Sequence, residues 1–140
     1  MEDTAVHDLA ATIKALVRDT NRMWTEGDIS ADSTIRQVDL RLEAVQYSPR
    51  FADGPWRARS AQEWLDGTLE AARALAGQGC SWSLHDLVIL PRSEREAVAS
   101  YRIVHDWSDG RKPASALFLE TWRRSTQGRW NLVRHTAEKI

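Results

Sequence analysis

The chain has 140 residues, the usual size of one domain, so we expect a single globular domain over residues 1–140. Apolar residues make up 42% and charged residues 28% of the chain, and these values exclude a largely disordered protein. Nineteen basic residues are balanced by twenty acidic ones, so we expect no nucleic-acid partner. No apolar run approaches the roughly 20 residues that span a bilayer, and the single Cys80 has no cysteine to pair with, so we expect a cytoplasmic protein without a membrane partner.

The sequence begins with an amphipathic helix. Apolar side chains recur at steps of three and four between Val6 and Trp24, which predicts a helix over residues 4–26 with one buried side. Gly27 ends the pattern, and Trp24 falls on the apolar side, so we predict that it belongs to the core.

A short helical turn over residues 32–38 and a strand over residues 40–48 are predicted next, with Pro49 closing the strand. The polar loop that follows could cover a cavity. We therefore predict Trp56, at the end of this loop, and Tyr47, at the end of the strand, as ligand contacts.

The second long helix has the clearest start signal in the sequence. Residues 60–63, Ser-Ala-Gln-Glu, form a capping box, in which the serine and the glutamate bind the free backbone N–H groups of a helix start. Apolar residues continue at helical spacing until Gly77 and Gly79 stop the helix. Trp64 lies on its apolar side and is predicted to be a core residue.

The remainder of the chain predicts an antiparallel meander. Stretches of strand-forming residues alternate with turn signals, and helices that precede such a meander indicate an α+β architecture. The predicted strands cover residues 80–90, 97–107, 114–124 and 130–137.

This order of elements, together with residues 116–124 (ALFLETWRR) and 128–135 (GRWNLVRH), resembles the nuclear-transport-factor-2-like superfamily and its SnoaL-like branch. The resemblance covers nearly the whole chain. It implies a cone-shaped barrel, in which the N-terminal helices pack inside a strongly curved antiparallel sheet, with an internal pocket and frequent dimerisation through the outer face. Enzymes of the superfamily include polyketide cyclases, ketosteroid isomerases, scytalone dehydratases and epoxide hydrolases.

The ketosteroid isomerase mechanism is disfavoured by two departures from that family's pattern. The isomerases carry an Asp-Pro pair whose aspartate is the general base, and the matching pair here is Ser48-Pro49. An unactivated serine cannot transfer a proton at neutral pH. The tyrosine of the isomerases' first helix is also missing, because this helix contains Asn21 and Trp24 but no tyrosine.

Alternation along the strands predicts which side chains share a face. If the turns pair Trp107 with Ala114 and Arg123 with Trp130, the strands separate into two faces, of which the more aromatic should be concave. The predicted concave face holds Tyr101, Ile103, His105, Trp107, Ala114, Ala116, Phe118, Glu120, Trp122, Asn131, Val133, His135 and Ala137.

The candidate catalytic residues are the polar members of this face. Tyr101 is predicted opposite Glu120, and Phe118 opposite His135, which makes Glu120 and His135 diagonal neighbours about 7 to 8 Å apart at Cα. With His105 they provide the groups that acid-base chemistry needs. Two structural alternatives remain open: each histidine could be a hydrogen-bonded core residue, and Glu120 could only accept a bond from Tyr101, His135 or a tryptophan N–H.

Aromatic residues on the same face are the predicted ligand walls, namely Phe118, Trp107 and Trp122. Two histidines and a glutamate are also a ligand set for non-haem iron. The spacing is not specific for a metal, so we predict neither a metal nor a cofactor.

Two functions stay open. The first is an enzyme that acts on a hydrophobic or aromatic metabolite by cofactor-independent acid-base chemistry, of the cyclase, dehydratase or isomerase type. The second is a non-catalytic module for small-molecule binding or dimerisation. Three or more convergent titratable groups open to solvent would favour the enzyme. In either case we expect a homodimer through the outer face, where Leu117, Leu119, Trp130 and Leu132 are predicted.

Overall fold

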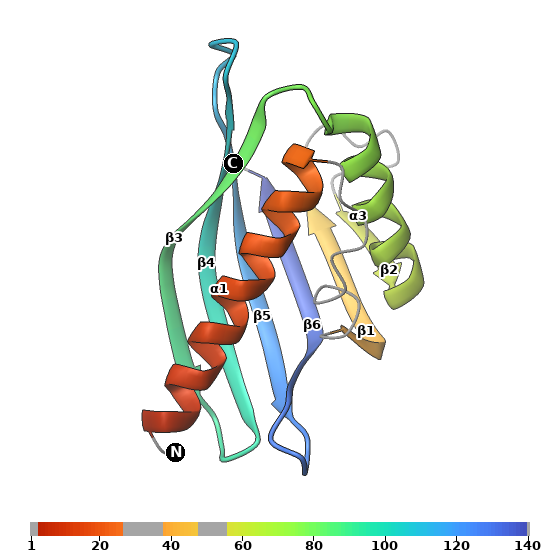
Figure 1. Cartoon of the computed structure of the whole chain (residues 1–140). Coiled ribbons are helices and arrows are strands. Elements are labelled where there is room, and N and C mark those ends of the chain that lie inside the picture. The colour runs from red at the N-terminus through yellow and green to blue at the C-terminus, as the bar shows by residue number, and fades with distance from the viewer. Residues whose placement is uncertain (1–2, 27–37, 48–55, 140) are drawn as a thin grey trace.

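A computed structural model describes residues 3–26, 38–47 and 56–139, which form two helices and one six-stranded sheet (Figure 1). The predicted strands agree with the observed ones, and a short strand, β2, precedes the second helix where none was predicted. The helical turn predicted before β1 and the loop that follows β1 lie outside the described residues. The elements are α1 (Asp3–Glu26), β1 (Val38–Tyr47), β2 (Trp56–Ser60), α3 (Ala61–Leu75), β3 (Cys80–Pro91), β4 (Glu96–Trp107), β5 (Ala114–Arg124) and β6 (Trp130–Lys139).

The sheet has the strand order β2-β1-β6-β5-β4-β3. All neighbouring strands are antiparallel except β1 and β6, which run parallel. Both helices lie on one side of the sheet: α1 crosses it diagonally and contacts β3, while α3 packs beside β1 and β2 (Figure 1). This is the α+β architecture that the sequence predicts.

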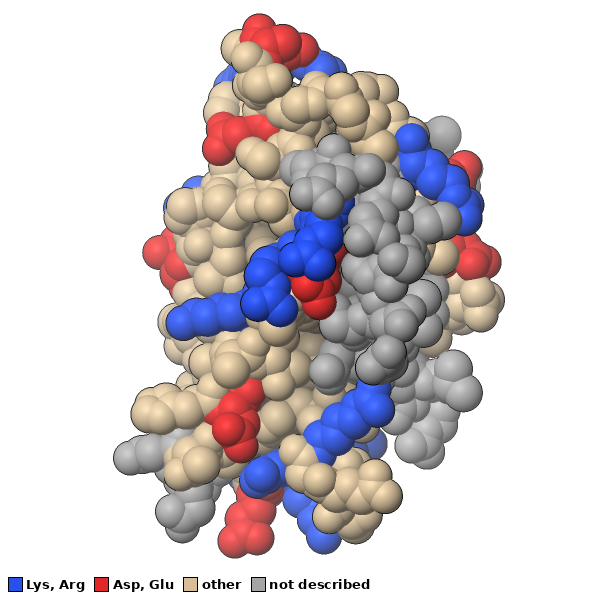
Figure 2. Space-filling view, viewed as in Figure 1, with Lys and Arg blue, Asp and Glu red and all other residues tan. Residues whose placement is uncertain are grey.

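Helix α1 is amphipathic, as its periodicity predicts. Leu9 and Ile13 are fully buried in the core, where each contributes about 1.5–3 kcal/mol relative to an exposed side chain. The opposite side of the helix carries Lys14, Arg18 and Arg22, which are exposed at intervals of four residues. Figure 2 shows basic side chains along this exposed side of the helix. Among the residues that the structure describes, no helix combines the length and apolar surface that a membrane crossing needs.

The capping box forms as predicted. The Glu63 backbone N–H donates to Ser60 Oγ at 3.2 Å, and the Ser60 backbone N–H donates to Glu63 Oε1 at 3.0 Å. Two donors of the first turn are thereby satisfied, which fixes the residue where α3 begins. Trp64 follows the box directly and packs against the core, as expected.

The β4–β5 register differs from the prediction by two residues. Tyr101 lies opposite Phe118 instead of Glu120. A shift by an even number of residues keeps every side chain on its predicted face, so the concave assignments on these two strands are correct.

On β6 the predicted faces are wrong for the first half of the strand. Trp130 and Leu132, predicted on the outer face, are 2% and 0% exposed and belong to the core. Asn131 and Val133, predicted on the concave face, are partly exposed.

The cause is the register at the β5–β6 turn, because Trp130 pairs with Arg124 instead of the predicted Arg123, an offset of one residue. A β-bulge at Val133 then cancels the effect of this offset on the faces of the later residues. Leu132 pairs with Trp122, whereas Arg134 pairs with Thr121, so β6 has one residue more than β5 at this point. One extra residue reverses the alternation of side chains. The later residues of β6 therefore return to the faces that the sequence predicts.

A second irregularity bends β3. Asp86 has a φ angle of 59°, a left-handed conformation that is uncommon outside glycine, and the register shifts between His85 and Val88. The Asp86 carboxylate accepts a hydrogen bond from Arg102 Nε at 3.3 Å. Before this point the even-numbered Leu84 packs against the core, and beyond it the odd-numbered Leu87 does.

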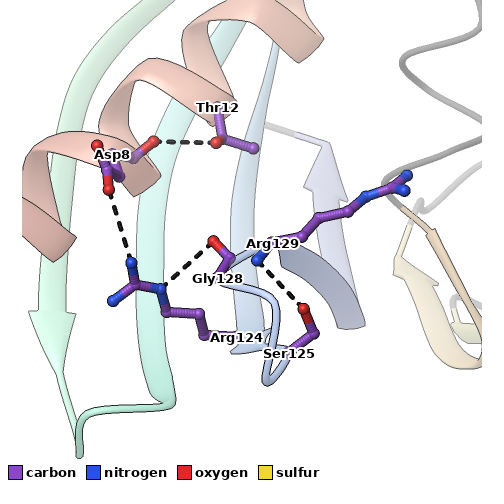
Figure 3. Close-up of polar contacts among 6 residues, drawn as sticks. All are labelled: Asp8, Thr12, Arg124, Ser125, Gly128 and Arg129. Atoms are coloured by element: carbon purple, nitrogen blue, oxygen red, sulfur yellow. Dashed lines mark hydrogen bonds and ion pairs between the residues drawn. The ribbon is translucent and has the colours of Figure 1, made fainter.

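The first turns of α1 are tied to the β5–β6 turn (Figure 3). Arg124 Nη2 lies 3.8 Å from Asp8 Oδ2, and Arg124 Nε donates to the Gly128 carbonyl at 3.4 Å. The turn itself is closed by Ser125 Oγ, which accepts from the Arg129 backbone N–H at 3.2 Å. This end of the sheet is therefore held to the helix by polar contacts.

Candidate functional site

The centre of the candidate site is a direct contact between a buried glutamate and a buried histidine. Glu120 on β5 lies opposite His135 on β6, closer than the diagonal arrangement predicted from the sequence. His135 Nδ1 is 2.7 Å from Glu120 Oε2, and the two residues are 1% and 2% exposed. Ala99 on β4 completes the row on the far side of Glu120. A contact this short between two buried groups is a charge-assisted hydrogen bond when the carboxylate is ionised.

Glu120 has two further partners. Trp122 Nε1 donates to Glu120 Oε1 at 3.1 Å, and the buried Tyr101 phenol interacts with the same carboxylate, which raises the pKa of the phenol. Both partners are buried. The sequence left open which of three groups would bond to Glu120, and the structure shows that His135 and a tryptophan, Trp122, both do, with Tyr101 close to the same carboxylate.

Tyr101 stays protonated. Burial raises the pKa of its phenol well above the usual value of 10, and the negative charge of Glu120 and the hydrogen bond to it raise the pKa further. Its hydroxyl is therefore a donor to the carboxylate at neutral pH.

Aromatic rings enclose His135. The Phe118 ring meets the imidazole edge to face, with centroids 4.7 Å apart, and the Trp64 ring lies 5.4 Å away in a tilted orientation. Phe118 also contacts Tyr101 at 5.3 Å and Trp82 at 6.2 Å between centroids. Because Nδ1 faces Glu120, Nε2 lies on the side of the imidazole that points away from the carboxylate.

His105 lies away from this network. Its ring packs against Trp82, with centroids 5.1 Å apart, and Trp82 in turn separates it from Phe118. The pKa of His105 is lowered from 6.5 to about 4. Burial is the larger cause, and the positive charge of Lys139 is the smaller one. His105 is therefore a neutral imidazole at physiological pH.

This lowered pKa predicts acid sensitivity. Below pH 6.5 the unfolded chain takes up a proton on His105 that the folded protein excludes until about pH 4, so stability is lost as the pH falls through this window. We expect His105→Gln to reduce this loss, as measured by urea unfolding at a series of pH values. At about pH 8, where both states carry a neutral histidine, the two proteins should differ only by packing. An unchanged pH dependence in the variant would contradict the assignment.

The remaining predicted contacts are placed as follows. Trp107 lies under the Arg111 guanidinium, whose carbon is 3.9 Å from the centre of the indole ring. Trp122 is buried in the core and bonds to Glu120, so its N–H is already used. The side chains of Trp24, Tyr47 and Trp56 lie outside the described part of the structure.

Sequence reasoning missed Trp82 and gave Trp64 only a core role. Trp82 lies opposite His105, and its backbone N–H donates to Asn21 Oδ1 of α1 at 2.6 Å. The signal was available, because the alternation that placed His105 on the concave face also applies to β3. Within the described ranges, no three His, Cys, Asp or Glu side chains are grouped so that they could hold a metal ion.

No protein-family model matches the sequence, and no curated protein matches it. Solved structures, however, are similar over nearly the whole chain. A nuclear-transport-factor-2-like protein of unknown function from Pseudomonas aeruginosa has 11% identity, covers 96% of each chain and has a TM-score of 0.69. A candidate scytalone dehydratase from Novosphingobium aromaticivorans has 17% identity, with 100% of this chain and 89% of that chain covered and a TM-score of 0.66.

A third similar structure, a nuclear-transport-factor-2-like protein of unknown function in nutrient uptake from Rhodospirillum rubrum, has 21% identity over 94% of this chain and 98% of that one, with a TM-score of 0.61. These likenesses confirm the nuclear-transport-factor-2-like fold that the sequence predicts. At such identities they show the fold alone, so the chemistry has to be argued from the site.

Proposed function

We propose that the protein is a small-molecule enzyme that transfers protons on a hydrophobic or aromatic metabolite without a cofactor, with His135 as the general base. The reaction would be of the cyclase, dehydratase or isomerase type. The observation that carries the proposal is the 2.7 Å contact between His135 Nδ1 and Glu120 Oε2, buried among aromatic rings.

We assign the enzyme to the cytoplasm, because Cys80 is buried and the chain has no second cysteine.

Glu120 and His135 have different roles in proton transfer. Glu120 accepts the Nδ1–H hydrogen bond and orients the imidazole, which leaves the lone pair on Nε2. Nε2 removes a proton from the substrate, and the resulting imidazolium is stabilised by the adjacent carboxylate. The proton then returns from Nε2 to another substrate atom, or to a departing hydroxyl, so that the enzyme is regenerated.

The rings around His135 favour a planar, apolar substrate. Phe118 and Trp64 both contact the imidazole, and a flat carbonyl compound between such rings would have a C–H next to the base. A carbon next to a carbonyl is the simplest proton source for this arrangement, because its anion is stabilised as an enolate.

Deuterium exchange tests the proposal without knowledge of the natural substrate. The protein is incubated in D₂O with 2-tetralone or 1-indanone as probe, and deuterium incorporation next to the carbonyl is followed by NMR. We expect exchange above the buffer rate. The matched control is His85→Asn, because His85 bonds to Ser83 Oγ and pairs with Arg102 on the outer face.

The same experiment separates the enzyme from the binding module. Tyr101, Glu120 and His135 converge as an acid-base site requires, but all three are buried, so ligand access to Nε2 is the point under test. Quenching of tryptophan fluorescence by a probe that shows no exchange would favour the non-catalytic module.

We also propose a homodimer through the outer face of the sheet. Trp130 and Leu132 are buried in the core, so they cannot belong to the predicted interface. Leu119 and Val88 both lie opposite Ser100, which places them in one row across three strands. The large apolar residues that are exposed on the described surface are Val88, Leu90, Leu117 and Leu119, at 62%, 54%, 42% and 52%.

A charge in this row should separate the two copies. We expect light scattering to give a dimer for the native protein at micromolar concentration and a monomer for Leu119→Glu, because a carboxylate would be buried in an apolar interface. Ala11→Glu, at an exposed position of α1, is the control that leaves the dimer intact. A native monomer at this concentration would contradict the proposal.

A further inference from the structure

We propose that Tyr101 and Trp122 are positioning residues that keep the shared proton of the His135–Glu120 pair on His135 Nδ1. This inference rests on the proposed function, because it explains how Nε2 remains free to accept a proton. It gives Tyr101 a supporting role instead of the catalytic one predicted from the sequence, and Trp122 a polar role beyond that of an aromatic wall.

The contact between His135 and Glu120 permits two protonation states, which differ by one proton. In the first, Glu120 is a carboxylate and accepts from Nδ1–H, so Nε2 carries a lone pair. In the second, the pair has taken up one proton from solvent: the Glu120 carboxylic acid donates to Nδ1, and the imidazole carries its proton on Nε2. The distance of 2.7 Å is compatible with both. Only the first arrangement leaves a base at Nε2.

The two other partners of Glu120 distinguish these arrangements. An indole N–H can only donate, so the 3.1 Å contact from Trp122 Nε1 requires Oε1 to be an acceptor. The Tyr101 phenol is held in its protonated form by burial and by the nearby carboxylate, which makes it a second donor. Hydrogen bonds to a carboxylate are about twice as strong as those to a neutral group, so both donors favour the first arrangement.

The backbone holds both donors in place. Tyr101 on β4 and Trp122 on β5 lie on the concave face, and both are buried in the hydrophobic core. Trp122 lies opposite Ala97, a small residue that leaves room for the indole, and Tyr101 packs edge to face against Phe118. Neither side chain can turn away from Glu120 without leaving a buried polar group unpaired.

The position of the proton is measurable by NMR. In the full ¹⁵N-labelled chain, two-bond ¹H–¹⁵N spectra distinguish a protonated from an unprotonated ring nitrogen, and His135→Asn identifies the His135 signals. We expect Nδ1–H in the native protein. Tyr101→Phe and Trp122→Phe should each raise the ratio of Nε2–H to Nδ1–H by about tenfold and lower the exchange rate of the ketone probe.

Phe118→Leu is the matched control, because Phe118 contacts the His135 ring but offers no hydrogen bond to Glu120. It should leave the proton on Nδ1. If the larger change, Trp122→Phe, prevents folding, Tyr101→Phe removes a single hydroxyl and still decides the question.

Two results would overturn the inference: a native protein with the proton on Nε2, or folded Tyr101→Phe protein with an unchanged ratio. A native Nδ1–H that shifts in the variants, without exchange of any ketone, would support the positioning role and reject the proposed function. The two failures are thereby distinguishable.

Discussion

His135→Asn is expected to lower the rate of probe exchange by about 10²- to 10⁴-fold, the range that general acid-base groups contribute. The asparagine amide can place an N–H near the position of Nδ1 and so retain a hydrogen bond to Glu120. It has no counterpart to Nε2 and cannot accept a proton at neutral pH. Initial rates of deuterium incorporation at equal concentrations of folded protein measure the effect.

Loss of structure has to be separated from loss of the base. Circular dichroism and the urea midpoint of His135→Asn should stay close to those of the native protein, because the shorter side chain retains the polar contact to Glu120. His85→Asn, on the other face of the sheet, should exchange the probe at the native rate. Near-native exchange by folded His135→Asn protein would remove His135 from the mechanism.

Much of the fold is predictable from local signals. The helical spacing of α1, the capping box of α3 and the alternating strands β3 to β6 all appear in the structure. The strand β2 was missed because it is short and gains its hydrogen bonds from β1, which is a tertiary contact. Local sequence carries little information about such a pairing.

The concave face was predictable only in part, and the β5–β6 turn explains why. Trp130 was predicted opposite Arg123 but lies opposite Arg124, and an offset of one residue exchanges the two faces of a strand. Trp130 and Leu132 were therefore assigned to the wrong face, and the extra residue of the bulge at Val133 returns His135 to the predicted one. Tyr101, Glu120, Trp122 and His135, the four residues of the network, lie on the face that alternation predicts.

The separation of His105 from His135 was not predictable. Both histidines share the concave face, but the real register places the aromatic rings of Trp82 and Phe118 between them. Side-chain packing, rather than strand alternation, decides which members of a face touch. The same packing buries His105 and lowers its pKa to about 4.

Glu120→Ala should be the most destabilising single change within the polar network. It would leave Trp122 Nε1, the Tyr101 hydroxyl and His135 Nδ1 buried without their acceptor. Each unsatisfied buried group costs about 1–3 kcal/mol, so we expect the free energy of unfolding to fall by about 3–5 kcal/mol. Urea unfolding followed by tryptophan fluorescence measures this loss. A midpoint equal to that of the native protein would show that the network does not support the fold.

Glu120→Gln separates this structural role from the chemical one. The amide oxygen can still accept from Trp122, so the expected loss of stability is smaller, about 1–2 kcal/mol. The amide N–H₂ group, however, can only donate toward His135, which forces Nδ1 to become an acceptor and moves the imidazole proton to Nε2. The base is then blocked while the protein stays folded, and exchange should fall about 10²-fold or more. Native exchange by folded Glu120→Gln protein would contradict the mechanism, because a proton on Nε2 leaves no lone pair to receive one from the substrate.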